Sequence, residues 1–154
     1  GVADRARDRL VRLIYLDAFV PEPGLSFFEL TGQGHQMRAA AVDGWRVPPN
    51  PSPPDTPEED LAWIAARRVH HPIGTLEQKF ELTQGPLELP RSYILCNRTE
   101  AFRSYADRAR RQGWPVQELD SSHNPHITAP DVLMQLLHGI AAGVDAPAKQ
   151  RAHA

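Results

Sequence analysis

The chain has 154 residues, of which 41% are hydrophobic and 23% charged, and its formal net charge is −2. One globular domain is the default at this length. The near-neutral charge gives no electrostatic case for binding nucleic acid or a membrane surface, and no apolar run approaches the ~18 residues that would span a bilayer. Cys96 is the only cysteine, which excludes an intrachain disulfide, and its place at the end of an apolar run favours a buried, inert thiol.

The first part of the chain contains one strand-like segment, followed by a long excursion at residues 20–89 before the next predicted strand. Residues 3–10 are charged and helix-favouring, and residues 11–19 (VRLIYLDAF) have the near-continuous apolarity of a strand buried on both faces of a parallel sheet. Residues 25–30 predict a short amphipathic turn or helix. Residues 32–56 are expected to be irregular. Their proline-rich end excludes a central strand, because proline cannot donate to the ladder, and indicates an extended loop or a disordered linker.

The second half of the chain alternates between helical and strand patterns. Thr56 is a plausible N-cap, with Pro57 at the first helical position, for a helix that ends near Arg68. The remaining predicted elements are, in chain order, a short helix at 75–80, a strand at 92–96, a helix at 100–112 with Gly113 as its cap, a strand at 114–119, and a helix at 130–142.

This order of elements is typical of the end of an open α/β sheet, with three mostly parallel strands and flanking helices. The excursion between the first two strands is too long for a simple crossover. We therefore predict a core of residues 1–19 and 90–144, a helical cap inserted at 20–89 over the carboxyl ends of the strands, and a flexible tail at 145–154.

Polar segments follow each predicted strand, at residues 17–19, 97–100 and 121–124. The carboxyl ends of parallel strands meet at one edge of a sheet, so these segments should converge there. An acid and a histidine at that edge are two of the three members of a nucleophile–histidine–acid triad. In such a triad the histidine takes the proton of the nucleophile and the carboxylate fixes the histidine tautomer.

Five segments carry a more specific resemblance: GVADR, LVRLIYLDAFVPEPGLSFFEL, HPIGTLEQ, RSYILCNRTEAF and GWPVQELDSSHNPHITAPDVL. They resemble the second half of small α/β-hydrolases of the esterase and hydroxynitrile-lyase-like group, over residues 1–142. In that group the phrase similar to GVADR follows shortly after the nucleophile elbow, G-x-S-x-G, and no G-x-S-x-G occurs in this sequence. The resemblance implies that the nucleophile lies outside this chain, and that the chain alone is inactive.

The resemblance also implies roles for individual residues. His123, in a loop that precedes the phrase ITAPD, matches the catalytic histidine. Many relatives carry the acid where Thr99 stands here, whereas others, including one class of haloalkane dehalogenases, carry it after the strand that LIYLD resembles, which indicates Asp17. Glu100 is the second candidate, although it also suits the first turn of a helix. Asp17 could instead be a structural turn carboxylate.

Aromatic residues and a further histidine are candidates for the substrate pocket, although aromatics of the excursion could equally form the core of the cap. They are Phe19, Phe27, Phe28, Trp45, Trp63 and His126. The histidines His35, His70 and His71 do not form an H-E-x-x-H motif and no cysteine cluster accompanies them, so we predict no metal and no cofactor.

We therefore expect a cytoplasmic, cofactor-free hydrolase that cleaves an ester or a related small substrate. An epoxide or haloalkane hydrolase or a lyase of the same fold, and a non-catalytic binding or scaffold protein, stay open as alternatives. The expected partners are a small-molecule substrate and the N-terminal half of the same hydrolase. Because a half-sheet exposes a strand edge, a homodimer is also possible.

Overall fold

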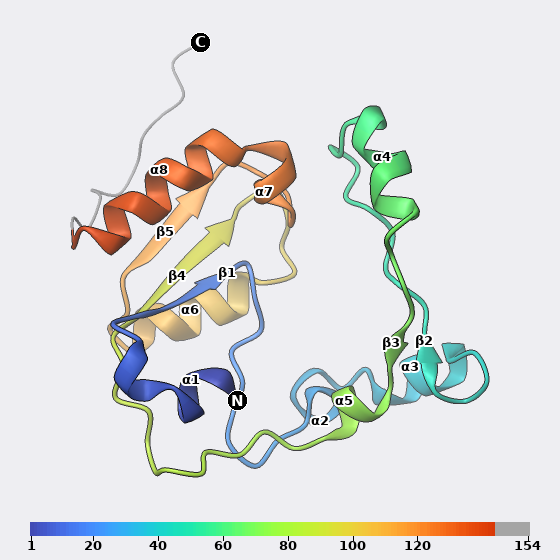
Figure 1. Cartoon of the computed structure of the whole chain (residues 1–154), viewed down its shortest axis with the longest axis horizontal. Helices are drawn as coiled ribbons and strands as arrows, with labels where there is room; N and C mark the ends of the chain where they lie inside the picture. Colours follow the sequence, from blue (N-terminus) through green and yellow to red (C-terminus); the bar gives the residue numbers. More distant parts are fainter. Residues whose placement is uncertain (144–154) are drawn as a thin grey trace. The chain divides into compact units, whose positions relative to one another are not determined.

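The computed structural model describes residues 1–143, so the predicted tail at 145–154 lies outside the described residues (Figure 1). The chain divides into two compact units. The excursion unit comprises Gly1–Ala6, Pro21–Ser52 and Glu58–Leu87, and the sheet unit comprises Arg7–Val20, Pro53–Pro57 and the described residues from Glu88 onward. The division into hydrolase core and cap stays a prediction.

The sheet unit is built on three parallel strands in the order β1-β4-β5 (Figure 1). They are β1 (Leu13–Leu16), β4 (Arg91–Cys96) and β5 (Val116–Leu119). The predicted parallel sheet is confirmed. The first strand is shorter than predicted, and its residues are only partly buried, because β1 pairs with one neighbour whereas the buried strand β4 pairs with two.

Helices cover both faces of this sheet, with α6 (Arg103–Arg111) on one face and α8 (Pro130–Ala141) on the other (Figure 1). Successive side chains of a strand point to opposite faces, and β4 shows this clearly. Tyr93 and Leu95 pack in the cluster of Ala106, whereas Ile94 packs in the cluster of Leu133. Burying each large apolar side chain contributes roughly 1.5–3 kcal/mol, so the central strand joins two cores.

The termini of these helices follow from local sequence. Gly113 follows Gln112, the C-cap of α6, and adopts the left-handed conformation, with φ of +75°, as a glycine at this position commonly does. A 3-10 turn at Arg7–Arg9 precedes β1, and a short helix α7 (Pro125–Thr128) precedes α8. The sequence patterns did not predict α7.

The excursion unit consists of short helices and one two-residue strand pair. Its elements are α1 (Val2–Arg5), α2 (Phe27–Thr31), α3 (Gly34–Ala40), β2 (Arg46–Val47), α4 (Glu58–Ala65), β3 (His71–Pro72) and α5 (Gly74–Glu77). Phe28, Val47 and Ile73 form its buried core. Ser26 starts α2 with a capping box, accepting a hydrogen bond from the backbone N–H of Glu29, whose carboxylate accepts one from the N–H of Ser26.

Two predictions for this region were wrong. Residues 32–56 are not entirely irregular, because α3 lies within them, in a stretch with several good helix formers. The side chain of Thr56 does not cap α4: its hydroxyl is buried without a hydrogen-bond partner among residues 1–143. Within the same residues, no helix is both long and apolar enough to cross a bilayer.

Candidate active site

Asp17 and His123 are 106 positions apart in the sequence and in direct contact in the sheet unit. Nδ1 of His123 lies 2.9 Å from Oδ2 of Asp17. The Asp17 side chain is fully buried, whereas that of His123 is 49% exposed. Asp17 follows β1 and His123 follows β5, so the two loops meet at the carboxyl edge of the sheet. The structure thus brings together the two residues that the sequence placed at that edge.

Asp17 is held by hydrogen bonds of its backbone N–H and of its side chain. Its backbone N–H donates to the carbonyl of Ile94 at 2.7 Å, and its Oδ1 accepts the backbone N–H of Cys96 at 3.0 Å. Its φ of +42° places it in the left-handed region, which aspartate tolerates better than most side chains. A buried carboxylate is costly unless its oxygens are paired. These contacts pair both oxygens and leave Oδ2 oriented toward the histidine.

His123 is oriented by a second contact, with an aromatic ring. Its imidazole stacks on Phe102, with the ring centroids 4.8 Å apart and the planes 9° from parallel. With Asp17 accepting at Nδ1, the neutral imidazole carries its proton on Nδ1 and presents Nε2 as a base. Nε2 has no hydrogen-bond partner in the described part of the chain.

The loop before His123 is tied to the turn that follows β4. The backbone N–H groups of Asn97 and Arg98 donate to the carbonyls of Leu119 and Ser121, at 3.0 and 3.2 Å. The guanidinium of Arg98 donates to both carboxylate oxygens of Asp120, at 2.9 and 3.2 Å. This hydrogen bonding lowers the pKa of Asp120. The histidine loop is therefore fixed from the neighbouring strand.

The other candidate groups at this edge are placed differently. The carboxylate of Glu100 is exposed and pairs with Arg103 at 2.7 Å, so the carboxylate in contact with His123 is that of Asp17 and not that of Glu100. The hydroxyl of Thr99 is buried and has no hydrogen-bond partner among the residues described. Burial raises the pKa of the Cys96 thiol to about 12, so a nucleophilic thiolate is not available there near neutral pH.

The predicted pocket residues divide between the two units. In the sheet unit, Phe19 packs edge-on against Phe102 and Tyr105, with ring centroids 4.9 and 5.2 Å apart, and His126 is exposed. In the excursion unit, Phe28 belongs to the buried core with Phe27 against it, and Trp45 and Trp63 are more than half exposed. Their joint role in one pocket stays a prediction.

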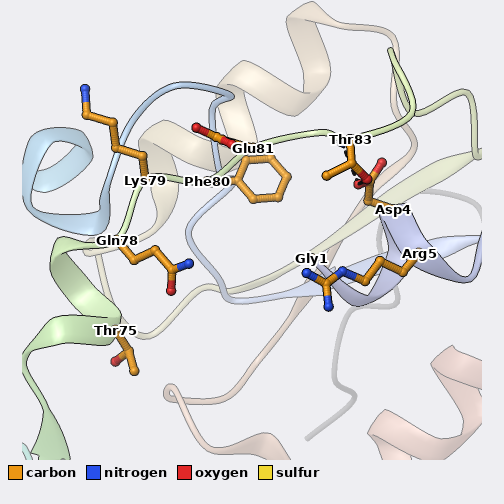
Figure 2. Close-up of a pocket in the computed structure, with 9 residues that line it drawn as sticks. All are labelled: Gly1, Asp4, Arg5, Thr75, Gln78, Lys79, Phe80, Glu81 and Thr83. Atoms are coloured by element: carbon orange, nitrogen blue, oxygen red, sulfur yellow. Dashed lines mark hydrogen bonds between the residues drawn. The ribbon is translucent and has the colours of Figure 1, made fainter.

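The excursion unit contains a separate cavity of about 510 Å³ (Figure 2). Phe80 lies among its lining residues together with charges of both signs, including Arg5 and Glu81. Asp4 is buried beside it and accepts hydrogen bonds from the backbone N–H and the hydroxyl of Thr83, at 2.8 and 2.7 Å. None of the predicted site residues lines this cavity. Across residues 1–143, no three histidine, cysteine or acidic side chains are grouped so as to hold a metal ion.

Sequence reasoning missed the part that Phe102 plays. The residue falls within the predicted helix 100–112, where an apolar side chain is ordinarily a core contact, and it does belong to the core. Its position shortly after the polar segment 97–100 was the available signal that it could reach the same edge as His123.

A parallel sheet with helices on both faces, an acid after its first strand and a histidine after its last corresponds to the C-terminal part of the α/β-hydrolase fold. The chain is 29% identical to the carbendazim hydrolyzing esterase of Nocardioides sp. (strain SG-4G), over 89% of this chain and 64% of that protein. The chain therefore spans less than two thirds of that relative. No protein-family model matches the chain.

Solved structures show the same fold. Polyneuridine aldehyde esterase is 15% identical, with a TM-score of 0.61 over 90% of this chain and 65% of that chain. Tomato methylketone synthase I, solved in complex with 2-tridecanone, is 16% identical, with a TM-score of 0.61 over 93% of this chain and 67% of that chain. Both are similar to this chain in architecture, and they differ from one another in named activity, so the fold does not determine the reaction.

Proposed function

We propose that this chain supplies the histidine and the acid of a nucleophile–histidine–acid triad in a cofactor-free hydrolase for esters or related small substrates. The contact of 2.9 Å between His123 and Asp17 carries the proposal. The nucleophile is proposed to lie outside these residues, as is the oxyanion hole, which in this fold uses the backbone N–H after the nucleophile and another from an upstream loop.

In the proposed mechanism, Nε2 of His123 takes the proton of a serine-type hydroxyl as its oxygen attacks the substrate carbonyl. The imidazolium that forms is stabilised by Asp17, which keeps its own charge. His123 then returns the proton to the leaving alcohol, and water repeats the sequence to release the acid. The buried, doubly anchored Asp17 supports this role because the carboxylate does not need to reorganise as the charge develops.

Ester chemistry is favoured over other reactions of the fold by the curated relative, whose name states that it hydrolyses carbendazim. Carbendazim and p-nitrophenyl esters are therefore the substrates to assay first. The assay requires the nucleophile, so it uses the complete protein or this chain mixed with the half that carries the elbow.

Single substitutions test the roles of the two residues. We expect His123→Ala to lower kcat by about 10⁶-fold and Asp17→Asn by about 10⁴-fold, the sizes of effect that the loss of a triad histidine and of its acid produce. Glu100→Gln is the matched control for the acid and should stay within about twofold of the parent enzyme. A full loss in Glu100→Gln with none in Asp17→Asn would assign the acid to Glu100. Activity of residues 1–154 alone, abolished by His123→Ala, would refute a nucleophile outside the chain.

The similarity to tomato methylketone synthase I leaves an epoxide or haloalkane hydrolase or a lyase of the same fold as the second candidate function. An aspartate at the elbow would indicate epoxide or haloalkane hydrolysis, and a serine would favour ester hydrolysis or a lyase. The non-catalytic alternative is supported by Thr99, which stands where many relatives carry an acid. It predicts that His123→Ala leaves ligand affinity unchanged and that no ester panel shows turnover.

A further inference from the structure

We propose that Asp55 is a positioning residue for His123 and acts through Ser122. The inference rests on the proposed function, because it assigns a task in the same site. The hydroxyl of Ser122, the residue immediately before His123, donates a hydrogen bond to Oδ1 of Asp55. Asp55 comes from the segment Pro53–Pro57, which lies in the middle of the long excursion and belongs to the sheet unit.

The surroundings of Asp55 show that this contact is enclosed. Ser122 is only 3% exposed, and the side chain of Asp55 is 25% exposed. Oδ2 of Asp55 is buried, accepts no hydrogen bond from any residue that the structure describes, and lies 3.7 Å from Nη1 of Arg98. A hydroxyl that donates to a carboxylate in such a place makes a strong, charge-assisted hydrogen bond.

The contact completes a set that fixes the residues directly before the histidine. Arg98 binds the carboxylate of Asp120 through its side chain and the carbonyl of Ser121 through its backbone N–H. Asp55 holds Ser122. Three successive residues are thus anchored, two from the turn after β4 and one from the excursion.

The proline-rich sequence around Asp55 explains how the excursion can present a carboxylate there. Pro53, Pro54 and Pro57 flank it, and proline restricts the backbone by fixing φ. The backbone N–H of Thr56 donates to the carbonyl of Pro53 at 3.1 Å, which closes a turn with Asp55 inside it. The proline-rich segment therefore holds the Asp55 carboxylate in place to accept the hydrogen bond of Ser122.

The consequence for catalysis concerns geometry. Phe102 and Asp17 orient the imidazole ring, but the backbone position of His123 depends on the loop that carries it. Misplacing a catalytic group by about 1 Å can cost on the order of 100-fold in rate. Releasing Ser122 should therefore lower the rate of the chemical step while leaving the affinity for substrate nearly unchanged.

The test compares substitutions on both sides of the hydrogen bond in the complete protein, with p-nitrophenyl acetate as substrate. Asp55→Ala and Ser122→Ala should each lower kcat by roughly 10- to 100-fold with KM within about twofold. Asp55→Asn retains an oxygen that can accept from Ser122, so it should recover most of the activity. The double variant Asp55→Ala/Ser122→Ala should be no worse than either single one, because both remove the same contact.

Asp107→Ala serves as the matched control, because Asp107 is likewise an aspartate paired with an arginine, Arg110, but on the exposed face of α6. It should leave kcat unchanged. Losses that multiply in the double variant, or a loss in Asp55→Ala without one in Ser122→Ala, would overturn the proposal. A drop in kcat for Asp55→Asn as large as that for Asp55→Ala would also overturn it.

A spectroscopic measurement separates positioning from general loss of fold. In ¹H–¹⁵N spectra, the Nδ1–H proton of His123 should exchange with water at least about fivefold faster in Asp55→Ala and Ser122→Ala, with circular dichroism unchanged. Unchanged exchange in well-folded variants would refute the inference. His123→Ala and Asp17→Asn are assayed alongside. If these two variants keep full activity, the proposed function fails. If they lose activity while the Asp55 and Ser122 variants keep it, only the positioning role is refuted.

Discussion

The hydroxyl of Tyr93 makes two hydrogen bonds to the backbone of a single residue, Ala18. It donates to the carbonyl of Ala18 at 2.8 Å and accepts the N–H of Ala18 at 3.0 Å. Tyr93 is fully buried in β4, and Ala18 directly follows Asp17. Burial raises the pKa of Tyr93 above its usual range, so the hydroxyl stays protonated and able to donate. The loop that carries the acid is therefore fastened to the central strand of the sheet.

Tyr93→Phe should lower the free energy of unfolding by roughly 1–3 kcal/mol, because it leaves both backbone groups of Ala18 without their partner. Tyr15→Phe, on the adjacent strand, is the control: its hydroxyl has no hydrogen-bond partner in the described range, so we expect a change of about 0.5 kcal/mol or less. Urea denaturation measures both. Equal effects from the two substitutions would contradict the role of the Tyr93 hydroxyl.

Phe102→Leu should lower kcat under conditions in which the variant is still fully folded. Leucine preserves most of the apolar volume but removes the stack on His123 at 4.8 Å and the edge contact with Phe19 at 4.9 Å. Aromatic pairs of this kind contribute about 0.5–1.5 kcal/mol beyond burial. Trp114→Leu removes a stack on Tyr15 and should reduce stability without lowering kcat. The idea fails if Phe102→Leu destabilises the protein but turns over substrate at the parent rate.

Cys96 should be inert to thiol reagents in the folded protein. Its side chain is fully buried, and burial, reinforced by the negative charges of Asp17 and Asp55, raises its pKa from 9.0 to about 12. The folded state therefore favours the protonated thiol. This contribution to stability is complete below pH 9 and is lost as the pH rises toward 12. Reaction with Ellman's reagent at pH 8 should follow unfolding, and rapid labelling without loss of structure would contradict it.

The capping box of α2 should make the start of that helix sensitive to acid. Hydrogen bonds from the backbone and side chain of Ser26 lower the pKa of Glu29 from 4.5 to about 2. The stabilisation is thus present above pH 4.5 and is lost as the pH falls through about 2. Titration of the Glu29 carboxyl by NMR measures this directly. Ser26→Ala removes the hydroxyl but keeps the backbone N–H, so it should move the midpoint only part of the way toward 4.5. A midpoint near 4.5 in the parent protein would show that the capping box does not hold Glu29.

The sequence by itself determined the elements that depend on local pattern. A run of apolar residues marked the strand at 92–96, the amphipathic pattern marked the helix at 130–142, and Gly113 marked the end of α6. The order of these elements predicted the parallel sheet. It also predicted the edge at which Asp17 and His123 lie, because the ends of parallel strands necessarily gather there.

Only the tertiary structure decided which acid reaches His123 and what holds the histidine loop. In the sequence, Asp17 and Glu100 are both carboxylates that follow a predicted strand. The choice between them depends on the contact of His123 with Asp17, across 106 positions, and on the burial of the Asp17 carboxylate. The pairing of Ser122 with Asp55 spans 67 positions. Such contacts arise from packing of distant segments, for which local periodicity and propensity carry no signal.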